Sequence, residues 1–281
     1  MSNTVTESAL LPTTEAAAVR PLPAARKVGF PQALRAEGIK LRSVRSTTWT
    51  LASLVVLGVG LTVIVCASSA EWLASSDADE SPGSFITWGM MFAQLSALVL
   101  GSIFVTSEYA RGMIATTVAA VPRRVTIIAA KSVLLVAVLF VVGTLTAFAG
   151  YFGGNAFLAN EGVGMSLSDD GVLRALFGSG LYLAVLGLFG AALGLLLRHT
   201  AAAVTFGIAL VFVLGNLVVL VPGATGEWLT KLMPGNAGSP ISTVTSFNPD
   251  LLGAWPGFAV FCAETALLLG VATVRFVRRD A

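Results

Sequence analysis

The chain has 281 residues, of which 56% are hydrophobic and only 11% are charged, and its mean hydropathy is +0.85. A water-soluble domain carries about 25% charged residues, so this composition excludes an ordinary soluble protein. Six apolar segments are each near the roughly 20 residues that cross a bilayer as a helix, and they lack the alternation of barrel strands. We therefore expect an all-α integral membrane protein built as a bundle of six transmembrane helices.

The N-terminal part of the chain divides into two segments. Residues 1–29 are rich in Ala, Thr, Ser and Pro without apolar periodicity, which predicts a disordered cytoplasmic tail. In residues 30–48, Leu34 and Leu41 share one helical face while basic residues surround it. This pattern predicts an amphipathic helix that lies in the membrane surface. The alternative is a charged flank that only sets the topology.

The transmembrane domain is expected to occupy residues 49–281. Its six spans are predicted at residues 49–67, 85–106, 132–152, 175–197, 201–221 and 256–274.

Charge is distributed unequally between the two sides of these spans. The side that holds both termini carries 15 of the 17 basic residues, and the other side carries Arg174 and Lys231. That other side holds nine of the 15 acids: Glu71, Asp77, Asp79, Glu80, Glu161, Asp169, Asp170, Glu227 and Asp250. Because Lys and Arg accumulate on the cytoplasmic side, both termini are expected in the cytoplasm, with the chain in the cell membrane.

The sequence lacks the motifs of common catalytic sites. It has no GxxxxGK[ST] phosphate loop, no HExxH and no GxSxG, so we expect neither an enzyme nor a nucleotide site in this chain. With a single His and with Cys66 and Cys262 both inside spans, neither a metal site nor a disulfide is expected.

Glu264 is an acidic residue in the middle of the last span. A carboxyl group at that depth costs roughly 2.5–3.5 kcal/mol, so it should face the bundle interior or water. In one interpretation it contacts substrate or exchanges protons. In the other it is a protonated structural residue that is hydrogen-bonded to a neighbouring hydroxyl group.

The loop at residues 107–131 combines polar and apolar residues in a helical pattern. Glu108 and Arg111 are three positions apart and can pair on one face, with Met113 on the adjoining side. Pro122 then stops the run. Such a helix suits docking into a groove on a soluble partner. The alternative is a loop that only sets topology.

Four segments together resemble a known family. They are the loop from Ser107 to Arg124, residues 35–49 (RAEGIKLRSVRSTTW), residues 233–238 (MPGNAG) and the tail 278–281 (RRDA). The chain from about residue 30 onward is similar to type-2 ABC transporter permeases of the actinobacterial type. Glu264 departs from the apolar last span of that family.

The resemblance implies a subunit that forms the translocation pathway of an ATP-driven exporter. It implies a dimer of permeases, either two copies or a sister chain, and two separate ATPase subunits that bind ATP and Mg²⁺. The substrate would be amphiphilic: a drug, antibiotic, peptide or lipid. Besides these subunits the partner is the lipid bilayer, and no nucleic acid is expected. The site residues implied are Glu108, Tyr109, Arg111, Gly112 and Met113 for ATPase coupling, and Glu37, Lys40, Arg42 and Arg45 in the connecting helix. Glu264 is a candidate for the substrate pathway because of its position in the last span, and not because of the resemblance.

Two other functions remain open at this point. The first is a membrane scaffold or immunity protein that binds a partner and transports nothing. The second is an ion-coupled secondary transporter that uses Glu264 and needs no ATPase.

Overall fold

The computed structural model describes residues 29–110, 112, 124–248 and 250–279. Within these residues every regular element is a helix, and six helical segments are long and apolar enough to cross a membrane. The prediction of an all-α, multi-pass integral membrane protein is confirmed at this level.

The helices fall into long spans and short connecting elements. In chain order they are α1 (Phe30–Ser43), α2 (Arg45–Ala74), α3 (Met90–Ala110), α5 (Arg124–Asn160), α6 (Val172–Leu197), α7 (Thr200–Ile208), α8 (Gly215–Leu217), α9 (Ala224–Leu232), α10 (Pro234–Gly238) and α11 (Ala254–Arg279). Between them lie the 3₁₀ turns η1 (Pro82–Ser84), η3 (Val218–Leu220) and η4 (Ser239–Ser242), and the π-helical segment η2 (Ala209–Leu214).

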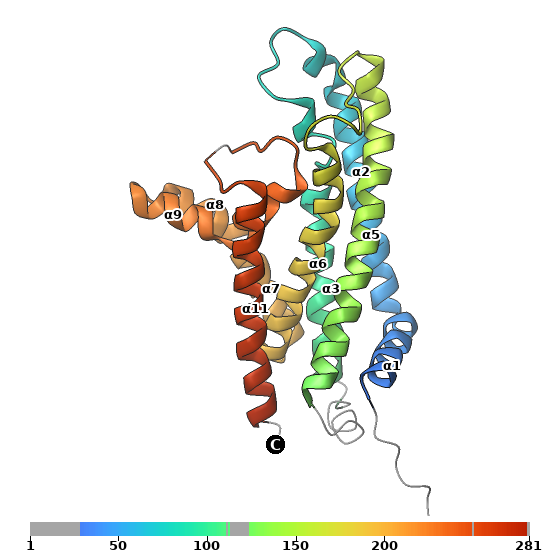
Figure 1. The fold of residues 1–281 in the computed structure, drawn as a ribbon, viewed down its shortest axis with the longest axis vertical. Helices are drawn as coiled ribbons and strands as arrows, with labels where there is room; N and C mark the ends of the chain where they lie inside the picture. Colours follow the sequence, from blue (N-terminus) through green and yellow to red (C-terminus); the bar gives the residue numbers. More distant parts are fainter. Residues whose placement is uncertain (1–28, 111, 113–123, 249, 280–281) are drawn as a thin grey trace, which may run out of the picture.

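Helices α3 and α6 form the centre of the bundle. In their apolar windows 67% and 72% of residues are buried, against 22% to 33% in the other four spans. Helices α2 and α5 stand on one side of this pair, and α7 and α11 stand on the other (Figure 1). The outer helices therefore expose apolar side chains, as expected of surfaces that face lipid or another chain.

Glycine permits the close approach of the two central helices. A methyl group at Gly101 of α3 would overlap the carbonyl oxygen of Gly187 on α6, and one at Gly190 would overlap the carbonyl oxygen of Leu98. The Ser102 hydroxyl also donates to the Gly190 carbonyl oxygen at 3.2 Å. The small-residue pattern of the fourth span thus lies in a contact within the chain, where small residues let backbones meet.

Helix α5 is longer than its predicted span. Its 37 residues extend about 55 Å at 1.5 Å per residue, well beyond a hydrocarbon core of about 30 Å. At its far end Asn155 exchanges hydrogen bonds with the backbone of Met165, at 2.9 and 2.8 Å, and the Tyr151 hydroxyl donates to the same carbonyl oxygen at 2.6 Å. The loop after α5 is therefore fastened back onto the helix.

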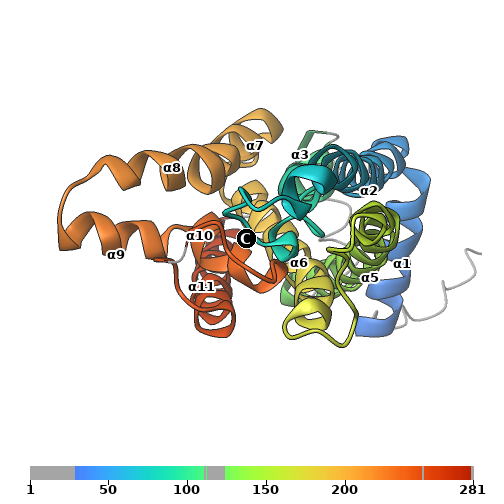
Figure 2. The ribbon, with the colours of Figure 1, turned by 90° about the horizontal axis from the view of Figure 1, so that it is seen from above.

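The expected helix at residues 30–48 is divided in two. Helix α1 ends at Ser43, because Val44 has extended backbone angles (φ −90°, ψ 114°), and α2 begins at Arg45. Seen from above, α1 lies across the bundle beside α5, whereas α2 runs along it (Figure 2). The chain changes direction at Val44, before the predicted start of the first apolar span at residue 49.

The fifth span is irregular. Helix α7 leads into η2, then α8 and η3, and α9 returns toward α10 (Figure 2). Figure 1 shows α8 and α9 projecting away from the upright helices, and we call residues 215–232 the arm. The arm exposes Leu220 (78%) and Trp228 (59%), so its surface is apolar. A π-helical segment inside a helix is often found at a functional site.

Candidate functional site

Four charged side chains from three helices meet at the end of the bundle where α1 lies. We call Glu37, Lys40, Glu108 and Lys131 the charge cluster. Lys40 Nζ lies 2.8 Å from Glu37 Oε1 and 2.9 Å from Glu108 Oε1. Lys131 Nζ lies 2.5 Å from Glu37 Oε2 and 2.9 Å from Glu108 Oε1. Each lysine therefore contacts both carboxylates, and the charges alternate and sum to zero.

Helix geometry places each member of the cluster. In α1, Ala33, Glu37 and Leu41 are four residues apart, form its buried face and pack toward α5. Glu108 occupies the last turn of α3. Lys131 lies two turns into α5, and its ammonium group is 4.3 Å from the centroid of the Phe104 ring. The cluster thus connects α1, α3 and α5.

Burial makes the cluster energetically important. The side chains of Glu37 and Glu108 are 3% and 4% exposed, and that of Lys131 is 9% exposed. Removing one partner of a buried ion pair leaves an uncompensated charge and costs about 3–5 kcal/mol. Lys40 is more exposed, at 34%. Burial lowers the pKa of Lys40, but Glu108 and Glu37 together raise it more, and the net shift is upward.

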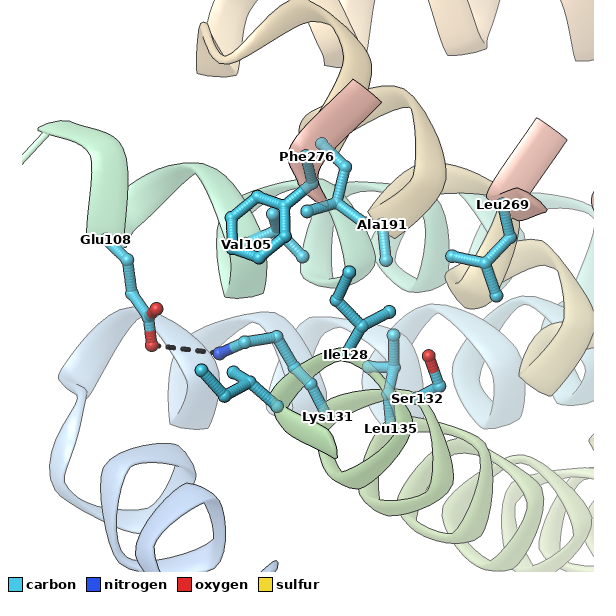
Figure 3. Close-up of a pocket in the computed structure, with 11 residues that line it drawn as sticks. Val105, Glu108, Ile128, Lys131, Ser132, Leu135, Ala191, Leu269 and Phe276 are labelled. Atoms are coloured by element: carbon cyan, nitrogen blue, oxygen red, sulfur yellow. Dashed lines mark hydrogen bonds and ion pairs between the residues drawn. The ribbon is translucent and has the colours of Figure 1, made fainter. Parts of the chain in front are cut away.

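A small cavity adjoins the cluster. It has a volume of about 20 Å³ and lies among the ends of α3, α5, α6 and α11. Figure 3 shows Glu108 and Lys131 on one side, with Phe276 and Leu269 of α11 on the other. Glu108 Oε2 is buried and has no hydrogen-bond partner among the described residues. The cavity is large enough for one water molecule.

The residues predicted to couple to an ATPase lie around the end of α3. Tyr109 is half-buried, with the Arg198 guanidinium 5.4 Å from its ring centroid. Gly112 is exposed and has φ +65°, a left-handed conformation that commonly ends a helix. Arg111 and Met113 lie outside the described residues, and so does the predicted pairing of Glu108 with Arg111. The Glu108 carboxylate is buried and contacts two lysines, so it presents no surface for docking.

The connecting-helix residues separate into two groups. Glu37 and Lys40 belong to the charge cluster, whereas Arg42 and Arg45 are exposed. The sequence pattern predicts all four as one interfacial set. It does not predict that Glu37 and Lys40 meet Lys131 of α5 in one cluster.

Glu264 lies apart from the cluster, midway along α11. Its Oε2 atom is buried and lacks a hydrogen-bond partner in the described part of the chain, as does the neighbouring Thr265 hydroxyl. The hydroxyl partner expected for a purely structural Glu264 is therefore not found there. Residues 29–110, 124–248 and 250–279 also contain no group of three or more His, Cys, Asp or Glu able to hold a metal ion.

Comparison with known proteins does not assign the chain to a family. No family model matches it, and no curated protein is significantly similar to it. The similarity to ABC permeases therefore depends on the four segments of the sequence alone.

Proposed function

We propose that the chain is the permease subunit of an ATP-driven exporter of the ABC class. It pairs with a second permease copy or a sister chain, and with separate ATPase subunits that bind ATP and Mg²⁺. Together the permeases enclose the pathway for an amphiphilic substrate. The six apolar spans and the four family-like segments support this proposal.

The charge cluster is the observation that carries the proposal. Helix α3 ends at Ala110, directly before the segment in which the resemblance places the ATPase contact. Its last-turn residue Glu108 is bonded to Lys40 of α1 and to Lys131 of α5. A displacement of the loop by a partner therefore acts on three helices at once. A permease needs such a rigid connection between the docking loop and its spans.

The connection also suits a change between two states. ATP can drive transport only through contacts that differ between the inward-open and outward-open forms. Because the ion pairs are buried, breaking them is costly and the cluster moves as one unit. When the ATPases close, α1 then turns together with the end of α3 and the start of α5.

The arrangement of the chain ends supports a cytoplasmic position for both termini. Helix α1, the end of α3 and the C-terminal end of α11 lie at the same end of the bundle (Figure 1). That end carries most of the basic residues, which favour the cytoplasmic side. The same arrangement brings α1 close to the headgroup level, as an interfacial helix requires.

The test is affinity purification of the tagged full chain from its native membranes, followed by mass spectrometry. We expect a stoichiometric soluble subunit that carries GxxxxGK[ST]. Arg111→Glu and Met113→Glu should each release it, whereas Arg45→Glu, a charge-matched change outside the loop, should not. Glu108 is a poor choice for this test because its substitution also breaks buried ion pairs.

Transport provides the second half of the test. In vesicles that contain the chain and its ATPase, export should stop when the ATPase is inactivated. Equal flux with and without hydrolysis would refute the proposal. Recovery of the chain with only non-ATPase partners would favour the scaffold or immunity function instead.

A second candidate is an ion-coupled transporter that uses Glu264. The buried, unpartnered Oε2 of this residue favours it, since intramembrane carboxyl groups commonly mark ion pathways. Transport by such a protein would stop when the proton gradient is dissipated, even with ATP present. Glu264→Gln would abolish the pH dependence of transport, while Glu71→Gln, outside the cavities, would leave it unchanged.

A further inference from the structure

A second cavity lies toward the end of the bundle opposite α1. It has a volume of about 230 Å³ and is lined by residues at the start of α3, by α6, η2, α8, α10 and η4, and by residues 243, 246–248 and 251. This volume corresponds to about eight water molecules at roughly 30 Å³ each, enough for a small organic group. Among the residues that the structure describes, no Asp, Glu, Lys, Arg or His lines it, yet hydroxyl and amide groups surround it.

Most polar hydrogens in this cavity are already used. The Thr87 hydroxyl donates to the Ser242 carbonyl oxygen at 2.8 Å, and the Ser84 hydroxyl donates to the Thr245 carbonyl oxygen at 3.1 Å. Gln94 donates to a backbone carbonyl at 2.8 Å and accepts from the Tyr182 hydroxyl at 2.6 Å. A bonded hydroxyl keeps lone pairs but has no further hydrogen to give, so these hydroxyl groups can only accept a hydrogen bond from a ligand.

Two asparagines add acceptors to the same wall. Asn216 Nδ2 donates to the Phe212 carbonyl oxygen at 2.6 Å, and Asn236 Nδ2 donates to the carbonyl oxygens of Gly215 and Thr230 at 3.1 and 3.0 Å. A carbonyl only accepts, so each amide must direct its nitrogen at that backbone. The Oδ1 atoms of both asparagines therefore remain to accept hydrogen bonds from a ligand.

Aromatic rings complete the lining. Trp88, Phe212, Phe247 and Tyr182 all contribute to the wall. Aromatic faces attract organic cations, and they also pack against alkyl groups. A ligand that donates hydrogen bonds and carries a positive charge matches this combination of oxygen acceptors and rings.

An adjacent cavity has a net negative lining. It has a volume of about 280 Å³, includes Glu227, Asp250 and Lys231, and shares Asn248 and Leu251 with the first cavity. Two acids against one base give the lining of this adjacent cavity one net negative charge. This charge would raise the local concentration of cations and disfavour anions.

We propose that the 230 Å³ cavity is a binding site for an organic ammonium ion. The ammonium group donates to the Asn216 and Asn236 oxygens, and its alkyl part packs against the aromatic wall. The π-helical segment η2, which supplies Phe212 and precedes Asn216, shapes this wall. The site involves none of the residues implied in ATPase coupling, so it does not depend on the exporter proposal.

Equilibrium dialysis of the purified full chain in nanodiscs of zwitterionic lipid tests the proposal. The probe is n-butylammonium, compared with n-butanol and butanoate of the same length, and empty nanodiscs give the lipid background. We expect saturable binding of butylammonium, with at least about tenfold weaker binding of the alcohol and the carboxylate, because a hydrogen bond from a charged donor contributes about 1.5–3 kcal/mol, equivalent to a factor of ten or more.

Variants at Asn216 separate binding from misfolding, because this residue is exposed and tolerates change. Asn216→Leu should weaken butylammonium binding about tenfold. Asn216→Asp should strengthen it about two- to fivefold, as expected of a partly exposed ion pair, without strengthening butanol binding. Asn160→Leu, the same substitution at an exposed asparagine outside the cavity, should change neither.

Two results would overturn the proposal. One is equal binding of butylammonium and butanol, which would indicate a site for neutral molecules. The other is binding that exceeds empty nanodiscs but does not respond to either Asn216 variant. Neither result bears on whether an ATPase copurifies, so this proposal and the exporter proposal fail independently.

Discussion

Removing one carboxylate from the charge cluster should destabilise the whole bundle. Glu37→Gln keeps the shape of the side chain but leaves Lys40 and Lys131 to share Glu108 alone. The Lys131 side chain is 9% exposed and Glu37 is 3% exposed, so the lost attraction is poorly replaced by water. We expect a loss of about 3–5 kcal/mol in the free energy of unfolding, as for other broken buried pairs.

A double substitution distinguishes charge imbalance from lost packing. Lys131→Met alone leaves one excess negative charge and should also cost about 3–5 kcal/mol. Combined with Glu37→Gln, it leaves the neutral pair of Lys40 and Glu108. The double variant should then be more stable than the sum of the two losses predicts, by about 0.5–3 kcal/mol. Replacing buried pairs by apolar groups is often nearly neutral.

In the assay, SDS is titrated into the full chain in mild detergent micelles, and tryptophan fluorescence monitors its unfolding. Arg42→Gln provides the control, because Arg42 is an exposed residue of the same helix and should change stability by less than about 0.5 kcal/mol. A loss below about 0.5 kcal/mol for Glu37→Gln, or strictly additive single effects, would refute the reasoning that the cluster acts as one buried unit.

Further predictions concern other contacts of the fold. Gly101→Ala should cost about 1–3 kcal/mol because the methyl group meets backbone, whereas Gly60→Ala, which meets open space, should be neutral or slightly stabilising in the same SDS titration. The pKa of Lys40 is raised in the folded protein, so its contribution to the free energy of unfolding should be complete below about pH 10.4, the pKa in the unfolded chain. This contribution should be lost as the pH rises through the higher pKa of the folded protein. The difference in thermal midpoint between the wild type and Lys40→Met should thus stay constant from about pH 7 to 9.5 and shrink above that; a change within the neutral range would contradict it. Tyr182→Phe should cost about 1–3 kcal/mol by leaving the Gln94 oxygen unpaired, and Gln94→Leu in the same chain should recover part of the loss.

The sequence was sufficient to predict the six spans because apolar length alone determines them. It was insufficient to predict the break at Val44, since nothing in that residue type requires extended backbone there. The sequence also did not predict that η2 interrupts the fifth span, because π-helical and α-helical segments have similar apolar composition. Helix type and direction at these points depend on packing against other elements.

The charge cluster was only partly accessible from the sequence. Between residues 30 and 279, Glu37 and Glu108 are the two acids on the predicted cytoplasmic side, and this rarity was the available signal. Reasoning from local spacing associated Glu108 with Arg111, three residues away. The observed partners are 68 and 23 residues distant, at Lys40 and Lys131. Contacts across that separation follow from tertiary packing, which spacing on one helix does not reveal.

The neutral cluster leaves exposed positive charge on the described part of the surface at the α1 end. Its two acids are buried against lysines, so the exposed charged side chains described there on α1, α2 and α11 are arginines alone: Arg35, Arg42, Arg45, Arg275 and Arg278. Each basic residue near a membrane surface attracts anionic lipid by about 1 kcal/mol. The protein should therefore gather an annulus of acidic phospholipids around this end, and the composition of its lipid shell should change with ionic strength.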